Sequence, residues 1–478
     1  MDSLDTLTLI NSDDVQEALR LWHGGKPTRW PLHRLRLGFL LSNDENSYDS
    51  LAEGGPAAKN RAILNRGLEE LRLISPEAED LLRERYENRR DVVAVSNSLN
   101  ISESSLYYRQ KQAITQLTDI LIKLEQYANR DWQERMMMRL GLPSYTELVG
   151  ITTTKANLLD VLLNEDDYFI IAVDGLGGLG KTALADHIMR EVINTKRFDE
   201  IAWVTAKQTH LSTLGRLQVE SNRPALTYPM LVDNLATQFD LPQTKGMTQL
   251  QRQRYVKQFL TERACFIVID NLETVADYRT LLPELRRWQR PSKFLLTSRV
   301  RLLDEAEVFS LSLRELEMDA AFQLIRAEAQ RTGFQALADA GGEELKQIYE
   351  LVGGNPLALK LIVGQLRFRS LPRVLDRFAS KTITNSPEGL FDYIYHDIWE
   401  TLGDESKMTL LALTQAGETG FTFEHIVELS ELSPEAVDHC LEKLIMLSLV
   451  DLSGSLIERR YRLHRLTEVF LLRMLGEE

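Results

Sequence analysis

The sequence predicts an α/β domain with a parallel sheet in the middle of the chain, preceded by a helical domain and followed by two smaller ones. Three observations predict this. From Leu148 onward, apolar β-prone runs alternate with helical runs, as a parallel sheet requires. A glycine-rich loop joins the first of those runs to a helix, whereas the first 88 residues have helical patterns without such a loop. The predicted domains are residues 1–147, 148–313, 314–384 and 385–478.

The composition is that of an ordinary globular protein. At 478 residues the chain is too long for one hydrophobic core, so about two to four domains are expected. A net charge of −14 argues against non-specific coating of nucleic acid. Cys265 and Cys440 lie far apart in apolar settings, which predicts buried free thiols in a reducing compartment. No signal peptide or membrane-spanning run is recognisable, so we expect a cytoplasmic protein without a membrane partner.

Residues 91–112 of the first domain have a helix-turn-helix pattern. Four residues fall on one face of the first helix: Val92, Val95, Ser96 and Leu99. Asn100 can adopt the left-handed conformation that a tight turn needs. Ser102 or Glu103 can cap the second helix, and Leu106 is expected to dock it on the first.

This pattern resembles the DNA-binding region of sigma factors and related regulators, in which the turn residue is usually glycine. If the segment binds DNA, six residues lie on or near the reading face: Ser104, Ser105, Tyr107, Tyr108, Arg109 and Lys111. The alternative is a helical interaction module with the same packing. The local charge is nearly balanced, and Asp91 and Glu103 lie close by, which weakens the electrostatic footprint expected for nucleic acid.

Residues 174–182 read Asp-Gly-Leu-Gly-Gly-Leu-Gly-Lys-Thr, between an apolar run and an amphipathic helical run. This is the G-x-x-x-x-G-K-T pattern of a P-loop in its proper context. Glycines let backbone N–H groups turn toward a phosphate, and the following helix presents its positive end to the same anion. The predicted phosphate-binding residues are Gly175, Gly177, Gly178, Leu179, Gly180, Lys181, Thr182 and Ala183.

In such a loop Lys181 reaches the β- and γ-phosphates, and the Thr182 hydroxyl is a ligand of Mg²⁺. The sequence therefore predicts an α/β P-loop NTPase domain that binds a nucleoside triphosphate or diphosphate. The alternative is a glycine-rich turn without a ligand.

The strands of the sheet are expected at 169–174, 200–206, 265–270, 293–298 and 308–313. The third is a nearly continuous apolar run that brings Asp270 to its carboxyl end, where a P-loop nucleotide would lie. A carboxylate there holds Mg²⁺, as in the Walker B element. Arg299, after the next strand, could sense a γ-phosphate because guanidinium binds phosphate bidentately. The alternatives are an acidic residue that ends a strand by chance and a solvated surface arginine.

With these elements in order, the chain from Leu148 to its end resembles the NB-ARC class of STAND signalling ATPases, relatives of apoptotic regulators and plant resistance proteins. The resemblance covers about two-thirds of the chain, through the P-loop, the second strand at 198–204 and the sensor motif at 296–299. It implies ATP or ADP as ligand, with Mg²⁺. It also implies that Val149 and Gly150 line the adenine pocket, where the family's usual arginine is replaced by Ile151.

Residues 353–359 resemble the family's G-x-P element, which implies that Pro356 and Leu357 lie near the adenine in a small helical domain. Proline at the first turn of a helix fixes the backbone. Taken alone, this segment is an ordinary helix start.

The last part of the chain has helical patterns followed by a hairpin, with a turn at 453–455, which predicts a winged helix. In the family, a Met-His-Asp element follows the wing and its histidine contacts the β-phosphate of ADP. The counterpart here is His464, followed by Arg465 instead of an acid. Without the resemblance, His464 would be interpreted as a core residue.

The resemblance implies a signalling switch. ADP would hold three domains together through Lys181, Pro356 and His464, and exchange for ATP would expose surfaces for self-association. A sensor or effector protein partner is expected, because no repeat region is recognisable: either a sensor region is missing from this sequence or a separate partner senses the signal.

The candidate catalytic residues of the switch are Lys181, Asp270, Arg299 and Glu273. The position after the Walker B aspartate, often a second acid in the family, is Asn271. Because an amide is no general base, slow hydrolysis or a role for Glu273 is expected.

The sequence leaves two other functions open. One is an ATP-controlled transcription regulator that binds DNA through the N-terminal helix-turn-helix. In the resembled family the winged helix is structural, and Glu435, Asp438 and Glu442 on its presumed recognition helix would repel phosphates. The other is a small-molecule kinase, which needs a substrate pocket with its own base, and none is recognisable.

Overall fold

The computed structural model describes residues 10–28, 30–33, 35–42, 48–143, 145, 147–164, 168–206, 209–211, 217–219, 226–241, 244–272, 275–288, 290–301, 307–367, 369–374, 399, 402–416, 420–447, 449–454, 458–463, 467–468 and 470–471. The chain divides into two compact units, Met1–Arg139 and Leu140–Glu478.

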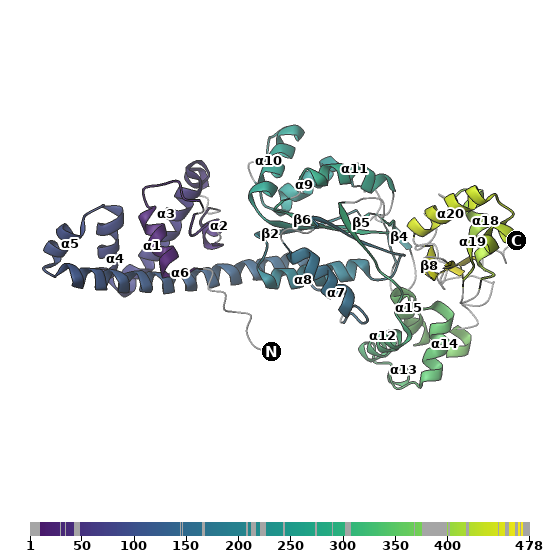
Figure 1. The fold of residues 1–478 in the computed structure, drawn as a ribbon. Helices are drawn as coiled ribbons and strands as arrows, with labels where there is room; N and C mark the ends of the chain where they lie inside the picture. The colour runs from purple at the N-terminus through teal and green to yellow at the C-terminus, as the bar shows by residue number, and fades with distance from the viewer. Residues whose placement is uncertain are drawn as a thin grey trace. The chain divides into compact units, whose positions relative to one another are not determined.

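The first unit is helical, in agreement with the prediction of an all-α domain (Figure 1). Its elements are α1 Ser12–Arg20, α2 Leu37–Ser42, α3 Tyr48–Ile74, α4 Pro76–Leu82, the π-helical turn η1 Arg83–Glu87, α5 Val92–Leu99 and α6 Glu103–Leu140. The main core joins α1, α3 and α6 through fully buried side chains such as Val15, Leu64 and Leu117. In the described part of the chain, no helix has the length and apolar character needed to cross a membrane.

The turn between α5 and α6 has the geometry expected from the sequence. Asn100 is left-handed, with φ 56°, and the Asp91 carboxylate accepts a hydrogen bond from Ala94 N at 2.7 Å to cap α5. Leu106 packs with Val95 in a small buried cluster. Leu99, the last residue of α5, is 46% exposed.

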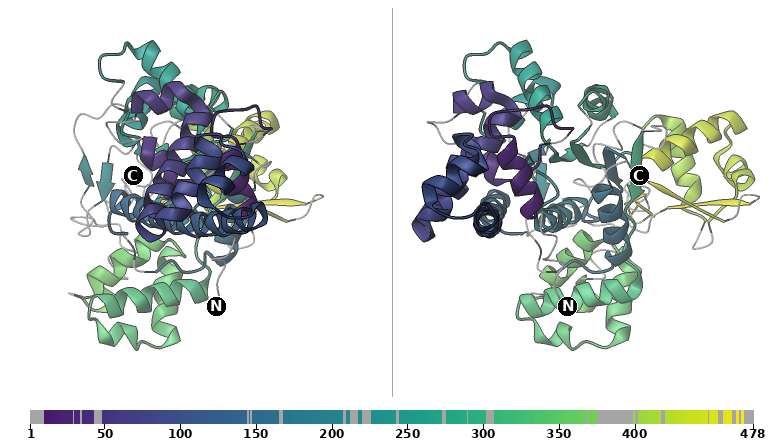
Figure 2. Two further views of the ribbon diagram at one scale, coloured as in Figure 1. Left: turned by 90° about the vertical axis from the view of Figure 1, so that its left-hand side faces the viewer. Right: turned by 60° about the vertical axis from the view of Figure 1, so that its left-hand side comes forward.

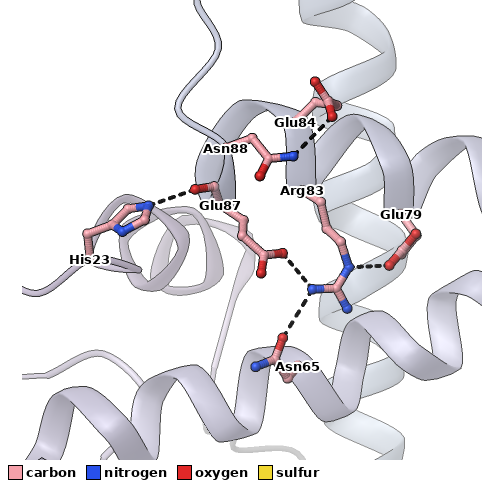
Figure 3. Close-up of polar contacts among 7 residues, drawn as sticks. All are labelled: His23, Asn65, Glu79, Arg83, Glu84, Glu87 and Asn88. Carbon is pink, nitrogen blue, oxygen red and sulfur yellow. Dashed lines mark hydrogen bonds and ion pairs between the residues drawn. The ribbon is translucent and has the colours of Figure 1, made fainter.

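A hydrogen-bonded cluster centred on Arg83 joins three helical segments of the first unit (Figure 3). The guanidinium contacts the carboxylates of Glu79 and Glu87 and donates to Asn65 Oδ1 at 3.2 Å. The side chain of Glu79 is only 4% exposed. Because a buried carboxylate needs a partner, Arg83 allows this acid to lie inside the unit. His23 Nε2 lies 2.8 Å from the carbonyl oxygen of Glu87.

The second unit is built on a parallel sheet with strand order β2-β5-β6-β1-β7. The strands are β1 Ile170–Asp174, β2 Glu200–Thr205, β5 Cys265–Leu272, β6 Lys293–Ser298 and β7 Val308–Ser312. They match the predicted strands to within two residues at each end, and the α/β fold class is confirmed. All six residues from Cys265 to Asp270 are buried, which explains their unbroken apolar pattern.

Helices cover both faces of this sheet (Figure 1). On one side lie α9 Tyr228–Gln238, α10 Gln249–Glu262 and α11 Val275–Arg286, and on the other α7 Thr152–Leu163 and α8 Lys181–Thr195. A short antiparallel pair, β3 Thr209–Leu211 and β4 Leu217–Val219, follows β2.

Two further groups of elements follow the sheet and share a hydrophobic core (Figure 2). The first comprises α12 Met318–Arg331, α13 Gln335–Ala338, α14 Gly342–Val352 and α15 Pro356–Leu366. The second comprises α18 Asp404–Leu413, α19 Phe423–Ser430, α20 Pro434–Met446 and the antiparallel strands β8 Val450–Gly454 and β9 Arg459–Leu463. The hairpin expected from the sequence is therefore present, and its membership of a winged helix stays a prediction.

Candidate nucleotide-binding site

The glycine-rich loop runs from the carboxyl end of β1 to the first turn of α8. Three of its glycines have positive φ: Gly175 at 143°, Gly178 at 84° and Gly180 at 93°. The first helical hydrogen bond of α8 runs from Leu184 N to Gly180 O, so the N–H groups of residues 181–183 precede the helical ladder. No side chain caps this end of the helix. These N–H groups and the helix dipole form an anion-binding site of the P-loop kind.

The side chain of Lys181 lies against the backbone of the P-loop. Its ammonium donates to the carbonyl oxygens of Gly175 at 2.6 Å and Leu176 at 2.8 Å. A phosphate oxygen is a stronger acceptor than a carbonyl oxygen because the hydrogen bond becomes charge-assisted on both sides. The lysine is thus close to the loop backbone and can exchange these acceptors for phosphate.

Thr182 and Asp270, the predicted Mg²⁺ ligands, lie side by side although 88 residues separate them. Thr182 Oγ1 donates to Asp270 Oδ1 at 2.8 Å, and Thr297 Oγ1 donates to the same oxygen at 2.6 Å. Asp270 is 3% exposed. A hydroxyl and a carboxylate at this spacing fit a hard cation such as Mg²⁺, which takes few protein ligands and completes its shell with phosphate and water.

Asn271 follows Asp270 within β5, where the pairing with β6 is shifted by a bulge. Its φ is 70°, a left-handed conformation that asparagine tolerates better than most residues. Asn271 N donates to Thr297 Oγ1 at 2.8 Å, so the threonine bonds both residues at the end of the strand.

Arg299 is 4% exposed, so the alternative of a solvated surface arginine is wrong. Its backbone N–H donates to Leu272 O at 3.4 Å, which holds it at the carboxyl edge of the sheet. Contact with a γ-phosphate stays a prediction.

The loop is bonded directly to the start of α15. Asn355 Nδ2 donates to Gly177 O at 3.0 Å, and Leu357 N donates to Gly178 O at 3.2 Å. The Asn355 Oδ1 atom also accepts from the backbone of residues 357 and 358, which caps α15. A Cβ on Gly178 would lie 2.8 Å from both Asn355 Oδ1 and Leu357 Cβ, so only glycine permits this approach.

The segment before α7 approaches the same region. Gly150 has φ 69°, and a Cβ there would lie 3.1 Å from Leu316 Cδ2. Leu316 N donates to Gly354 O at 2.9 Å, and Val149 packs on the core that contains α12 and α15. Val149, Gly150, Pro356 and Leu357 are therefore gathered around the start of α15, beside the loop.

Sequence reasoning missed two residues of this region. Asn355 carried only the signal of a helix N-cap, and its bond to Gly177 spans 178 residues. Asp174 precedes the first glycine of the motif and the sequence predicts no role for it, yet its carboxylate is fully buried and accepts from Ser310 Oγ at 2.7 Å and Ser312 Oγ at 2.6 Å. Two other expectations, Glu273 and His464, lie outside the described residues.

The segment that connects α6 to the second unit is attached to α8. Tyr145 Oη donates to Asp186 Oδ2 at 2.8 Å, and Arg190 bonds both this carboxylate and the carbonyl of Gly141 at 2.9 Å. Burial, and then the bond to Asp186, raise the pKa of Tyr145 above its ordinary value, so the phenol stays a donor.

The predicted nucleic-acid residues lie on the first part of α6, and five of them are exposed: Ser104, Tyr107, Tyr108, Arg109 and Lys111. Tyr107 is 55% and Tyr108 65% exposed, which is unusual for aromatic side chains in a packed helix. They are accessible to a partner of either kind.

A parallel sheet with a P-loop after its interior strand β1, a neighbouring hydroxyl–carboxylate pair and a buried arginine define a P-loop nucleotide-binding domain. Residues 151–334 match the family model of the NB-ARC domain. The match covers the sheet and the P-loop, agrees with the resemblance found in the sequence, and supports the expected binding of ATP or ADP.

Curated relatives are plant proteins. The probable disease resistance protein RXW24L of Arabidopsis thaliana is 23% identical over 318 residues, 64% of this chain and 31% of its own. A second probable disease resistance protein of that plant is 22% identical over 433 residues, 84% of this chain and 43% of its own. The chain thus spans less than half the length of these relatives.

Among solved structures, the ORC2 protein of Aeropyrum pernix, in ADPNP and ADP complexes, aligns with 71% of this chain and 98% of its own. The TM-score is 0.40 and the identity 17%. The fold is established by the strand order and the loop geometry described above.

Proposed function

We propose that the chain is an ATP- and ADP-dependent signalling switch in which the nucleotide controls how the P-loop domain and the α12–α15 helices are arranged. One observation carries this proposal: Asn355 and Leu357 at the start of α15 bond the carbonyls of Gly177 and Gly178. A nucleotide held by the loop therefore lies next to a second group of helices, so the arrangement of those helices can depend on whether the ligand is ADP or ATP.

Slow hydrolysis would reset the switch. The residue after Asp270 is Asn271, whose amide is no general base, and this supports slow hydrolysis. Glu273 remains the candidate for that role, and His464 the candidate for an ADP contact. ATP binding is proposed to lead to self-association, with a sensor or effector protein as the second partner.

The connection to the N-terminal unit runs through the attachment of Tyr145 and Gly141 to α8. In this proposal α8 binds phosphate at its first turn, while its residues Asp186 and Arg190 bond the connecting segment. A change at the loop can thus be transmitted along one rigid helix.

The test combines nucleotide content with size. Purified protein should contain bound ADP, and the Lys181→Ala variant should lose it. Chromatography with a non-hydrolysable ATP analogue should give a larger species than with ADP. A monomer of unchanged size with every nucleotide would contradict the switch.

DNA binding is the second candidate, favoured by the exposure of Tyr107, Tyr108, Arg109 and Lys111 on one helix. Duplex DNA should then bind in a salt-dependent manner, and Arg109→Ala combined with Lys111→Ala should abolish the binding. No binding at low salt would exclude this candidate.

A further inference from the structure

The buried Asp174 lies at the junction of three segments of the sheet. It ends β1, immediately before the P-loop, and its backbone is aligned with Ser298 of β6 on one side and Ser312 of β7 on the other. Its carboxylate accepts hydrogen bonds from the hydroxyls of Ser310 and Ser312. A carboxylate with no exposure to solvent also requires a cation nearby to offset its desolvation.

Arg301 is that cation. Its Nε lies 3.5 Å from Asp174 Oδ1, and its side chain is 13% exposed. Arg301 follows the end of β6 by three residues, so the ion pair links the segment after β6 to the strand that carries the P-loop. At this burial the pair is poorly screened by water, and removing one partner leaves the other charge uncompensated.

Arg299 lies between this ion pair and a second attachment point. Ser298 Oγ donates to Leu272 O at 3.0 Å and accepts from Val300 N at 2.9 Å. The segment 298–301 is thus held to β5 at one end and to β1 at the other. Its middle residue, Arg299, is 4% exposed.

We propose that Asp174 and Arg301 are positioning residues that hold Arg299 at a fixed place relative to the P-loop and thereby set the preference for ATP over ADP. This rests on the proposed contact of Arg299 with the γ-phosphate. Only ATP has that phosphate, so a displaced Arg299 weakens ATP binding and leaves ADP binding nearly unchanged. A general loss of order in the P-loop would instead weaken the binding of ADP and ATP equally.

The experiment measures the affinities of the full chain for ADP and for a non-hydrolysable ATP analogue by calorimetry. Arg301→Gln and Asp174→Asn are expected to lower the ratio of ATP to ADP affinity about tenfold, the size of one charge-assisted contact. Arg301→Lys keeps the charge and is expected to retain part of the ratio. Arg252→Gln is the matched control, because it breaks an Arg–Asp pair between α9 and α10, and it should leave both affinities unchanged.

The decisive comparison is the double variant Arg299→Ala with Arg301→Gln. If Arg301 acts through Arg299, the ratio of ATP to ADP affinity in the double variant is no lower than in Arg299→Ala alone. The inference would be overturned if the losses of the affinity ratio in the two single variants multiply in the double variant, or if the variants weaken the binding of ADP and ATP equally. It would also be overturned if either Arg301→Gln or Arg299→Ala keeps the wild-type ratio. If Asp174→Asn fails to fold, the Arg301 variants decide alone.

These results are separable from the fate of the proposed switch. If the wild-type protein carries ADP and forms a larger species with the ATP analogue, the proposed switch is supported. That result holds even if Arg301→Gln leaves the ratio of ATP to ADP affinity unchanged.

Discussion

Two regions of this molecule bury charged side chains, and they do so in different ways. At the Arg83 cluster, the guanidinium contacts two carboxylates, each four residues away on the same helical run, and Asn65 of α3. At the P-loop, Lys181 donates to backbone carbonyls of its own loop, and Asp270 accepts from two threonines. In the first cluster the charged side chains pair with one another. In the second, Lys181 and Asp270 bond neutral groups, which a charged ligand can replace as partners. Burial of charge therefore does not identify a binding site, but the type of partner does.

The largest difference is expected for Lys181→Ala. We expect the affinity for ADP to fall at least about a hundredfold, or ~2.7 kcal/mol, because a charge-assisted bond to phosphate is lost. Without nucleotide, the free energy of unfolding should change by less than about 1 kcal/mol, since the bonds of the ammonium to Gly175 O and Leu176 O are made to neutral carbonyls. Calorimetry with ADP and denaturant unfolding of the stripped protein measure the two quantities. A large loss of stability in the nucleotide-free variant would contradict the distinction between the P-loop and the Arg83 cluster.

Arg83→Ala should give the opposite result. The substitution leaves the buried Glu79 without its cation and should destabilise the first unit by about 2 kcal/mol, less than for a fully buried pair because Arg83 is 27% exposed. Nucleotide affinity should stay at the wild-type value. Hydrogen exchange of α3 and α4, measured beside the ADP titration, tests both parts. Arg66→Ala is the control, because its partners Glu69 and Glu70 lie on exposed positions of α3.

A smaller effect is expected at the contact between the loop and α15. Asn355→Asp keeps the oxygen that caps α15 but cannot donate to Gly177 O. ADP affinity should fall about three- to tenfold, corresponding to one net hydrogen bond of about 1 kcal/mol. Equal ADP affinity in the two proteins would show that the contact does not act on the nucleotide.

The smallest effect concerns Glu125, a buried acid of the first unit. It accepts from the backbone N–H groups of Arg36 at 3.0 Å and Leu37 at 2.9 Å, and burial raises the pKa of this carboxyl. A raised pKa means that the folded state holds the proton more tightly, so this contribution to stability is complete below the ordinary pKa of 4.5 and is lost as the pH rises through the folded value.

Glu125→Gln removes this titration. The variant should gain stability relative to the wild type as the pH rises from about 4.5 to 7, by less than about 1 kcal/mol. Denaturant unfolding of both proteins at several pH values measures the difference. Parallel stability curves would exclude the effect.

The strands and the P-loop could be predicted from the sequence because their signals are local. Apolar runs at 170–173 and 265–269 fix two interior strands, and the glycines at 175, 178 and 180 have the positive φ that a phosphate loop needs. Strand order could not be predicted in this way, because the sequence period of a strand carries no information about its neighbours.

Residues of the candidate site that are part of a sequence motif could be singled out from the sequence, whereas residues that act through long-range contacts could not. Asp270 and Thr182 were expected to meet, and they do. Asn355 and Asp174 depend on partners in segments far along the chain, Gly177 in one case and Arg301 in the other. Neither pairing leaves a mark on the local sequence, so only the folded chain reveals them.

Asn355 has a further property that follows from its neighbour. Spontaneous loss of an asparagine amide usually begins when the backbone nitrogen of the next residue attacks the side-chain carbonyl, and that nitrogen must give up a hydrogen. The next residue here is Pro356, whose nitrogen carries none. The amide that joins α15 to the P-loop is thus protected from chemical ageing, and the contact can last as long as the protein itself.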